Sequence, residues 1–146
     1  MAGQEIMIAP AEARDRDAVV QLWSLCGLVR HYNPPEKDFE FARGRDHSDI
    51  LTLRAESRLA GAVMVGHDGH RGWIYYLAVD PEHQHRGYGS QLVRAAEQWL
   101  PDRHVHKCQL MVRETNEGVV DFYRGLGYEN SPVLVMQRWL DGTNVT

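Results

Sequence analysis

A glycine-bearing turn behind a buried, apolar strand is the part of this sequence best suited to chemistry. The strand runs into Asp80-Pro81, the turn that follows carries Gly87 and Gly89, and a helix opens directly after it. The first N–H groups of a helix have no partner inside the helix and point outward at the positive end of its dipole. Glycine lets a phosphate approach the backbone where any side chain would block it. The turn is therefore predicted to bind an anion.

Two nucleotide-binding motifs that also place glycines before a helix do not fit this turn. A P-loop ends in Gly-Lys-Ser/Thr, whereas Gly89 is followed directly by Ser90 and the turn contains no lysine. The Rossmann motif needs three spaced glycines and an acidic residue about 20 positions later in a parallel unit. Neither pattern is present, so these two classes of nucleotide site are excluded.

The turn resembles the cofactor signature of the GCN5-related N-acetyltransferases (the GNAT family). Residues 84–89 read Gln-His-Arg-Gly-Tyr-Gly and match the family pattern Gln/Arg-x-x-Gly-x-Gly/Ala. Residues 77–81 resemble the family's central strand and exit turn. Residues 116–128 resemble its Asn…Phe-Tyr-x-x-x-Gly-Phe/Tyr motif. Two motifs in the expected order, separated by a helix and a strand, make the resemblance specific.

The resemblance implies that the protein uses acetyl-CoA as a co-substrate. In the family the pantetheine arm bonds the main chain of the central strand, here residues 77–79, and the pyrophosphate lies on the turn, here residues 85–90. Asn116 matches a further position that contacts the cofactor. The expected cofactor-binding residues are thus Leu77, Ala78, Val79, His85, Arg86, Gly87, Tyr88, Gly89, Ser90 and Asn116.

We expect direct transfer of the acetyl group to a primary amine in a ternary complex, with Tyr123 as the catalytic residue. Tyr123 matches the family's tyrosine near the cofactor sulfur, and a hydroxyl with an ordinary pKa of about 10 suits protonation of the leaving thiolate. The alternative is a core aromatic on an amphipathic helix. Cys26 and Cys108 lie in a predicted helix stripe and a predicted strand, without the features of an activated nucleophile, so no acyl-enzyme is expected.

The general base is left open by the sequence. Ribosomal-protein-alanine acetyltransferases of the family carry a glutamate at the position of Met111, so this sequence lacks that base, and the difference counts against that substrate class. Glu114, Asp68 and Tyr76 lie near predicted strand ends, and a water relay is the other alternative.

Residues 22–34 fall where the family builds its acceptor wall. This segment, like residues 66–72, resembles a bacterial subfamily of acetyltransferases, the YpeA-like proteins. The alternative is that Trp23 is a core residue and residues 30–33 form an ordinary loop. The acceptor is either a small-molecule amine or a peptide or protein amine. The candidate acceptor-side residues are Trp23, Arg30, Tyr32, Asp68, Tyr76 and Glu114.

A mixed α/β sheet is predicted to position these residues. Apolar patterning and turn residues predict strands at residues 6–9, 50–56, 59–66, 73–79, 107–113 and 132–140. Helical spacing predicts helices at residues 19–26, at about 34–43, on the stripe Leu92, Ala95, Ala96 and Trp99, and at 117–126. The resemblance implies one N-acetyltransferase domain over residues 1–146, with a mostly antiparallel central sheet and helices on both faces. An exposed last strand would allow homodimer pairing.

Composition excludes several other classes of protein. The 146 residues are 43% hydrophobic, enough for one domain with a core, and no apolar run approaches the roughly 20 residues of a membrane span. The N-terminus lacks signal-peptide order, so a soluble, cytoplasmic protein is expected. The net charge of −4 and the absence of a basic block argue against nucleic acid as a partner.

Neither metal binding nor a disulfide is expected from the remaining side chains. The two cysteines are far apart, and the close histidine pairs 67/70, 83/85 and 104/106 fall in separate predicted turns. A rival function from another class stays open: a non-catalytic CoA- or acyl-CoA-binding sensor module that retains the phosphate-binding turn.

Overall fold

The computed structural model describes residues 5–143 and divides the chain into two compact units, Met1–Leu110 and Met111–Thr146. The first unit holds a five-stranded sheet and three α-helices. Its strands are β1 (Ile6–Pro10), β2 (Ser48–Ala55), β3 (Arg58–His67), β4 (Gly72–Val79) and β5 (Cys108–Leu110). Its α-helices are α1 (Arg16–Leu25), α2 (Pro35–Ala42) and α3 (Tyr88–Trp99), with 3₁₀ turns η1 (Ala13–Asp15), η2 (Pro81–His83) and η3 (Pro101–Arg103).

The sheet has the order β1-β2-β3-β4-β5 and is mostly antiparallel. Each neighbouring pair from β1 to β4 is antiparallel, and β4 pairs with β5 in parallel. β4 is an interior strand, as its two apolar faces predict. The predicted mixed α/β class with a mostly antiparallel sheet is confirmed.

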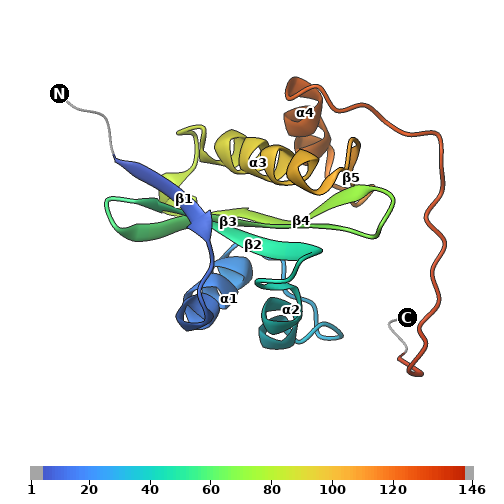
Figure 1. The fold of residues 1–146 in the computed structure, drawn as a ribbon, viewed down its shortest axis with the longest axis horizontal. Helices are drawn as coiled ribbons and strands as arrows, with labels where there is room; N and C mark the ends of the chain where they lie inside the picture. The colour runs from blue at the N-terminus through green and yellow to red at the C-terminus, as the bar shows by residue number, and fades with distance from the viewer. Residues whose placement is uncertain (1–4, 144–146) are drawn as a thin grey trace. The chain divides into compact units, whose positions relative to one another are not determined.

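Helices cover both faces of the sheet (Figure 1). On one face, Trp23 of α1 and Phe39 of α2 are fully buried against sheet residues that include Ile50 and Ala62. On the other face α3 packs across β2, β3 and β4. A Cβ at Gly61 would lie 2.8 Å from Leu92 Cδ1, so the missing side chain allows α3 to approach β3 closely.

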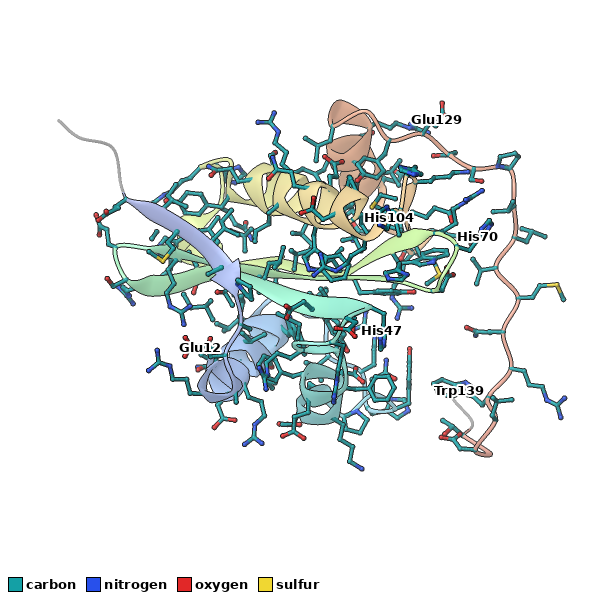
Figure 2. All side chains as sticks on the ribbon, in the orientation of Figure 1. Glu12, His47, His70, His104, Glu129 and Trp139 are labelled. Atoms are coloured by element: carbon teal, nitrogen blue, oxygen red, sulfur yellow. The ribbon has the colours of Figure 1, made fainter. Side chains whose placement is uncertain are left out.

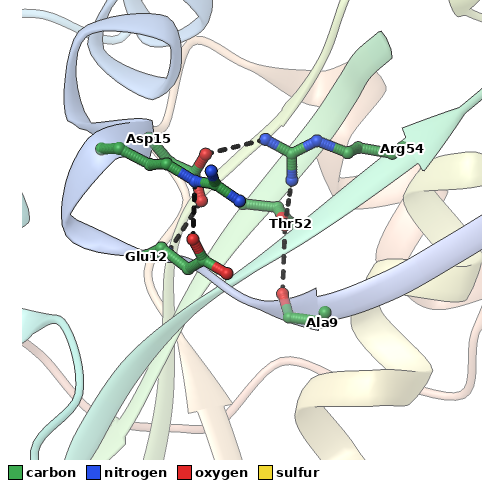
Figure 3. Close-up of polar contacts among 6 residues, drawn as sticks. Ala9, Glu12, Asp15, Thr52 and Arg54 are labelled. Carbon is green, nitrogen blue, oxygen red and sulfur yellow. Dashed lines mark hydrogen bonds and ion pairs between the residues drawn. The ribbon is translucent and has the colours of Figure 1, made fainter. Parts of the chain in front are cut away.

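A polar network fixes the start of α1 against the sheet (Figure 3). Asp15 Oδ1 accepts a hydrogen bond from Arg54 Nη2 at 2.8 Å, and Asp15 Oδ2 accepts one from the Glu12 N–H at 2.7 Å. The Thr52 hydroxyl donates to the Ala9 carbonyl at 3.1 Å. Because Asp15 is only 8% exposed, its carboxylate depends on these partners for the hydrogen bonds that water would otherwise supply.

The second unit contains α4 (Glu117–Gly125), close to the predicted helix. Residues 128–143 form neither helix nor strand, so the predicted strand at 132–140 is wrong. Its apolar side chains are open to solvent, with Leu134 92% and Met136 92% exposed. Alternating apolar residues form a strand only when a neighbouring strand accepts them, and the pattern alone does not provide that neighbour. The homodimer expectation loses its basis with this strand.

The strand predicted at residues 107–113 is also shorter than expected. β5 comprises only Cys108–Leu110 and pairs with Gly72, Trp73 and Ile74 at the beginning of β4. The rest of β4 extends beyond β5, and this difference in length shapes the candidate site.

Candidate active site

A β-bulge interrupts β4 just before the predicted cofactor strand segment. Met64 of β3 faces Tyr75, and Ala62 faces Ala78, so Tyr76 and Leu77 together oppose the single residue Val63. Tyr76 has a φ of 53°, which is uncommon for a residue with a side chain. Bulges of this kind redirect side chains and end strand pairing, and they are frequent beside active sites.

Beyond the bulge, one edge of β4 is left without a strand partner. β5 pairs only as far as Ile74, and the Asp80 N–H donates to the Ala60 carbonyl of the β3 side at 2.8 Å. Backbone groups of successive residues point to opposite edges, so those of Leu77 and Val79 point away from β3. Within residues 5–110, no strand covers this edge at Leu77 and Val79.

The Val79 carbonyl on this edge has two side-chain donors. It accepts a hydrogen bond from Cys26 Sγ at 3.3 Å and a long one from Gln84 Nε2 at 3.5 Å. Burial is the main cause that raises the pKa of the Cys26 thiol above its ordinary value. Cys26 is therefore held as a neutral donor at the end of β4.

The glycine turn follows this edge directly. Asp80 Oδ1 accepts from the Glu82 N–H at 2.8 Å and caps η2. His85 has a φ of 65° and Gly87 a φ of 80°, and these two left-handed residues reverse the chain into α3. No atom lies within 4 Å of a Cβ built on Gly87. Glycine is thus required here by the backbone conformation, and the space beside it is open.

The N-terminus of α3 supplies the predicted anion-binding groups. Its first recorded helical hydrogen bond runs from the Gln91 N–H to the Gly87 carbonyl at 3.1 Å, so the N–H groups of Gly89 and Ser90 precede the helix's own hydrogen-bond ladder. His85 and Arg86 are exposed, whereas Tyr88 is 3% exposed and packs its side chain in the core. Only the backbone of Tyr88 therefore suits a ligand role.

Three aromatic and acidic side chains meet on the α1–α2 face of the sheet. The Tyr76 ring stacks on Trp23 with centroids 4.1 Å apart and an angle of 17° between the rings. The Tyr76 hydroxyl donates to Asp38 Oδ2 at 2.7 Å. Burial, followed by the Asp38 carboxylate, raises the pKa of Tyr76 well above its ordinary value. Tyr76 is therefore a hydrogen-bond donor and a poor candidate for the general base.

Two other predicted acceptor residues lie near this cluster. The positive charge of Arg30 lowers the pKa of Tyr76, whereas the nearby Tyr32 hydroxyl raises it. Arg30 Nη1 donates to the carbonyl groups of Gly27 at 2.8 Å and Val29 at 3.2 Å. These hydrogen bonds hold its guanidinium against the backbone that follows the C-terminal end of α1. Trp23 is fully buried, so its contribution to this face is the support of the Tyr76 ring.

Asp68 serves the loop between β3 and β4 instead. Its carboxylate accepts from the N–H groups of Arg71 and His70 and from Trp73 Nε1, at 2.8, 2.9 and 3.2 Å. The hydrogen bond from Arg71, then those from Trp73 and His70, lower the pKa of Asp68 to about 2. A carboxylate of such low basicity, with both oxygens engaged, is badly suited to accept a proton from an amine.

The remaining predicted residues belong to the second unit. Asn116 is the N-cap of α4, and its side-chain oxygen accepts from the Val119 N–H at 3.4 Å. Tyr123 is 7% exposed and makes edge-on ring contacts with Phe122 and Tyr128 at centroid distances of 5.0 and 5.5 Å. Glu114 is exposed. The structure thus provides both a capping role and a core-packing role for two of the predicted site residues.

Sequence reasoning missed Asp38, Cys26 and, as a contact of the strand edge, Gln84. Asp38 lies 38 positions before Tyr76 and in a different element, so no local spacing connects the two. Cys26 is likewise 53 positions from Val79. Gln84 carried a usable signal, because it is the first residue of the turn motif.

The described part of the chain contains neither a cluster of metal ligands nor a helix that could span a membrane. Among residues 5–143, no group of three or more His, Cys, Asp or Glu side chains is placed to hold a metal ion. The labelled His70 and His104 come from different loops (Figure 2). No helix within the same residues is long and apolar enough to cross a membrane.

Solved structures of N-acetyltransferases share this fold. An aminoglycoside N-acetyltransferase solved in complex with CoA superposes with a TM-score of 0.78 at 16% identity, covering 95% of this chain and 97% of that one. The ribosomal-protein-S18-alanine N-acetyltransferase from Escherichia coli gives a TM-score of 0.74 at 22% identity, covering 87% of this chain and 79% of that one.

Sequence comparison extends the likeness from fold to family. An acetyltransferase from Yersinia pestis (strain Pestoides F) is 36% identical over 126 residues, which cover 86% of this chain and 89% of the relative. The sequence model of the acetyltransferase (GNAT) family matches residues 16–128. This span includes the bulged strand, the glycine turn and α4. This chain therefore belongs to the GNAT family of acetyltransferases.

Proposed function

We propose that this protein transfers the acetyl group of acetyl-CoA to a primary amine, directly and in a ternary complex, within one N-acetyltransferase domain that spans residues 1–146. The observation that carries the proposal is the continuity of two features. The uncovered edge at Leu77 and Val79 leads straight into the glycine turn and the N-terminus of α3.

These two features fit the two chemically different parts of CoA. An extended arm with amide groups can continue the hydrogen-bond ladder of a strand edge, as a missing strand would. A pyrophosphate fits backbone N–H groups at a helix N-terminus, and the open space beside Gly87 admits it. In this arrangement residues 77–79 hold the arm, residues 85–90 hold the pyrophosphate, and Asn116 adds a polar contact through its side-chain amide.

The chemistry requires few side chains. Acetyl-CoA supplies an activated acyl group, and the chain must position an amine, bind the developing oxyanion and protonate the leaving sulfur. Tyr123 is the residue we assign to the protonation step. The proton of the amine passes to water or to Glu114, because Met111 stands at the family's glutamate position, Asp68 is weakly basic, and Tyr76 already donates to Asp38.

The experiment measures acetyl-CoA binding and amine-dependent release of free thiol with the purified full-length chain. We expect acetyl-CoA to raise the melting temperature, by an amount that corresponds to about 2.7 kcal/mol at 100 times the dissociation constant. We also expect thiol release to increase when a panel of small-molecule and peptide amines is added. An absence of binding at millimolar acetyl-CoA contradicts the proposal.

The same experiment separates the enzyme from a CoA-sensing module. Tight binding combined with slow hydrolysis that no amine accelerates would support the sensor instead. The two structural relatives differ in what their names say they acetylate, an aminoglycoside and a ribosomal-protein alanine. The panel therefore contains both classes of amine.

A further inference from the structure

The carboxylate of Asp38 has an unused oxygen on the α1–α2 face. Its Oδ2 accepts from the Tyr76 hydroxyl at 2.7 Å, and within residues 5–143 its Oδ1 accepts no hydrogen bond. Asp38 is half-buried on α2, and Oδ1 is not among the buried atoms that lack a partner, so this oxygen is accessible to a ligand. A cationic donor placed at Oδ1 would form a strong, charge-assisted hydrogen bond.

The backbone around Tyr76 also departs from an unstrained strand. A non-glycine residue at a φ of 53° is strained, and such residues gather at sites where function requires the geometry. The Tyr76 side chain is clamped on two sides, by the Trp23 ring and by Asp38. Trp23 Nε1, in the same cluster, is buried without a hydrogen-bond partner.

The proposed direction of the cofactor brings its reactive end to this cluster. With the pyrophosphate on the turn after Asp80, the pantetheine arm runs back along β4 from Val79 toward Leu77. The next residue in that direction is the bulge residue Tyr76. The thioester end of the arm therefore falls where the Tyr76 side chain leaves the strand toward α1 and α2.

We propose that Asp38 and Tyr76 form the acceptor site, where the free carboxylate oxygen of Asp38 binds the acceptor as an alkylammonium ion. This inference rests on the proposed function. It names the acceptor class as an aliphatic primary amine, which is protonated at neutral pH like a lysine side chain. The Tyr76 ring adds an aromatic face for the same cation.

Charges on the neighbouring elements define the surroundings of this site. Arg30 and Tyr32 lie in the segment between α1 and α2. The charge of Arg30 lowers the pKa of Tyr76, and the hydroxyl of Tyr32 raises it. Arg30 already donates through Nη1 to the Gly27 and Val29 carbonyls, which keeps the cation bound to the backbone behind α1. Asp38 is thus the anionic group in direct hydrogen-bond contact with the bulge residue.

The test measures probe binding by NMR in the full chain saturated with CoA. The reporter is the Trp23 indole N–H resonance, assigned by its loss in Trp23→Phe. n-Butylammonium chloride is the probe, and butan-1-ol is its uncharged counterpart. We expect a saturable shift with the ammonium ion and none with the alcohol. Equal responses, or no response to the ammonium ion, overturn the acceptor site.

Matched variants assign the effect to Asp38. Asp38→Asn should weaken n-butylammonium binding at least tenfold, and Glu36→Gln, an exposed carboxylate in the same turn of α2, should change it less than twofold. Unchanged binding in a folded Asp38→Asn variant overturns the proposal, and the wild-type comparison with butan-1-ol decides if that variant does not fold.

A separate measurement keeps the two proposals distinguishable. CoA binding is followed by thermal shift before any probe is added. Failure to bind CoA contradicts the proposed function itself, whereas CoA binding without an ammonium response contradicts only the acceptor site. With acetyl-CoA, Asp38→Asn should raise KM for n-butylamine at least tenfold and leave KM for acetyl-CoA unchanged. Equal changes in both constants would indicate a structural role and overturn the assignment.

Discussion

Tyr76 belongs to two parts of the site. Its backbone forms the bulge of β4, and its side chain contacts Trp23 and Asp38 on the α1–α2 face. Its left-handed backbone costs about 1–3 kcal/mol. Stacking on Trp23 contributes about 0.5–1.5 kcal/mol beyond burial, and a hydrogen bond to a charged group about 1.5–3 kcal/mol. The side-chain contacts are therefore of the right size to offset the backbone strain. This balance explains how a tyrosine, and not a glycine, occupies the bulge.

Tyr123→Phe tests the proposed general acid. The substitution keeps the ring contacts with Phe122 and Tyr128 and removes the hydroxyl. We expect kcat to fall by roughly 10- to 1000-fold, on the scale of general acid catalysis, with CoA affinity unchanged. Steady-state kinetics and CoA titration provide the two measurements, and a melting curve controls for folding. Unchanged turnover would remove Tyr123 from the mechanism and leave it as a core aromatic.

Asp68 gives a pH dependence that belongs to the β3–β4 loop. Its pKa in the folded chain, about 2, lies below its ordinary value of about 3.9. Its stabilising contribution is therefore fully present above that ordinary value and is lost as the pH falls from about 4 to about 2. We expect a carboxyl-carbon NMR titration of Asp68 to give a midpoint near 2.

A single donor provides the control for that titration. Trp73→Phe removes the indole N–H that donates to Asp68 Oδ2, so the midpoint should move upward. A wild-type midpoint near 4, or no change in the variant, would show that these hydrogen bonds are absent in solution.

The turn before α3 permits a matched pair of glycine substitutions. Gly87 and Gly69 have φ values of 80° and 85°, and both have open space at the Cβ position. Alanine at either position should cost about 1 kcal/mol of folding stability for the same backbone reason. Only Gly87→Ala should also weaken CoA binding, by about tenfold, because its methyl group occupies the space proposed for the pyrophosphate. Equal CoA affinities in the two variants, by calorimetry, would contradict this assignment.

The junction of β1, η1 and β2 depends on the Arg54–Asp15 pair. Arg54→Met leaves a nearly buried carboxylate without its cation, so we expect a loss of about 2–4 kcal/mol in the free energy of unfolding. Arg16→Met is the control, since its pairs with Asp17 and Glu40 are exposed and should contribute less than about 1 kcal/mol. Urea unfolding measures both. A loss in Arg54→Met no larger than in the control would show that the buried pair is not needed.

Across the whole chain, the predictable features are those that local pattern determines. Gly87 and its turn, the interior position of β4 and the order of helices and strands through α4 follow from short-range spacing and turn chemistry. The bulge at Tyr76 does not, because an extra residue in a strand that is apolar on both faces leaves no trace in its pattern. Asp38 was missed for the related reason that its partner comes from a distant element.

The predicted strand at 132–140 fails for a different physical reason. Val133 and Val135 have strand propensity, but a strand is stabilised by cross-strand neighbours, and propensity does not specify them. The network of Asp15 with Arg54 was likewise invisible, since it joins residues 39 positions apart. Long-range pairing thus limits both the fold prediction and the site prediction.

The kinetic mechanism is a property of the whole molecule, and it is predicted to be sequential. A ping-pong reaction needs a nucleophile that accepts the acetyl group, and a thiol reacts as the thiolate. Cys26 is held by the Val79 carbonyl, and burial raises the pKa of its thiol, which lowers the thiolate fraction at neutral pH. We expect intersecting initial-velocity lines when acetyl-CoA and the amine are varied, and no gain of 42 Da in the intact mass of protein incubated with acetyl-CoA alone, roughly one acetyl group. Parallel lines with an acetylated protein would instead identify a covalent route, and the position of the added mass would name its nucleophile.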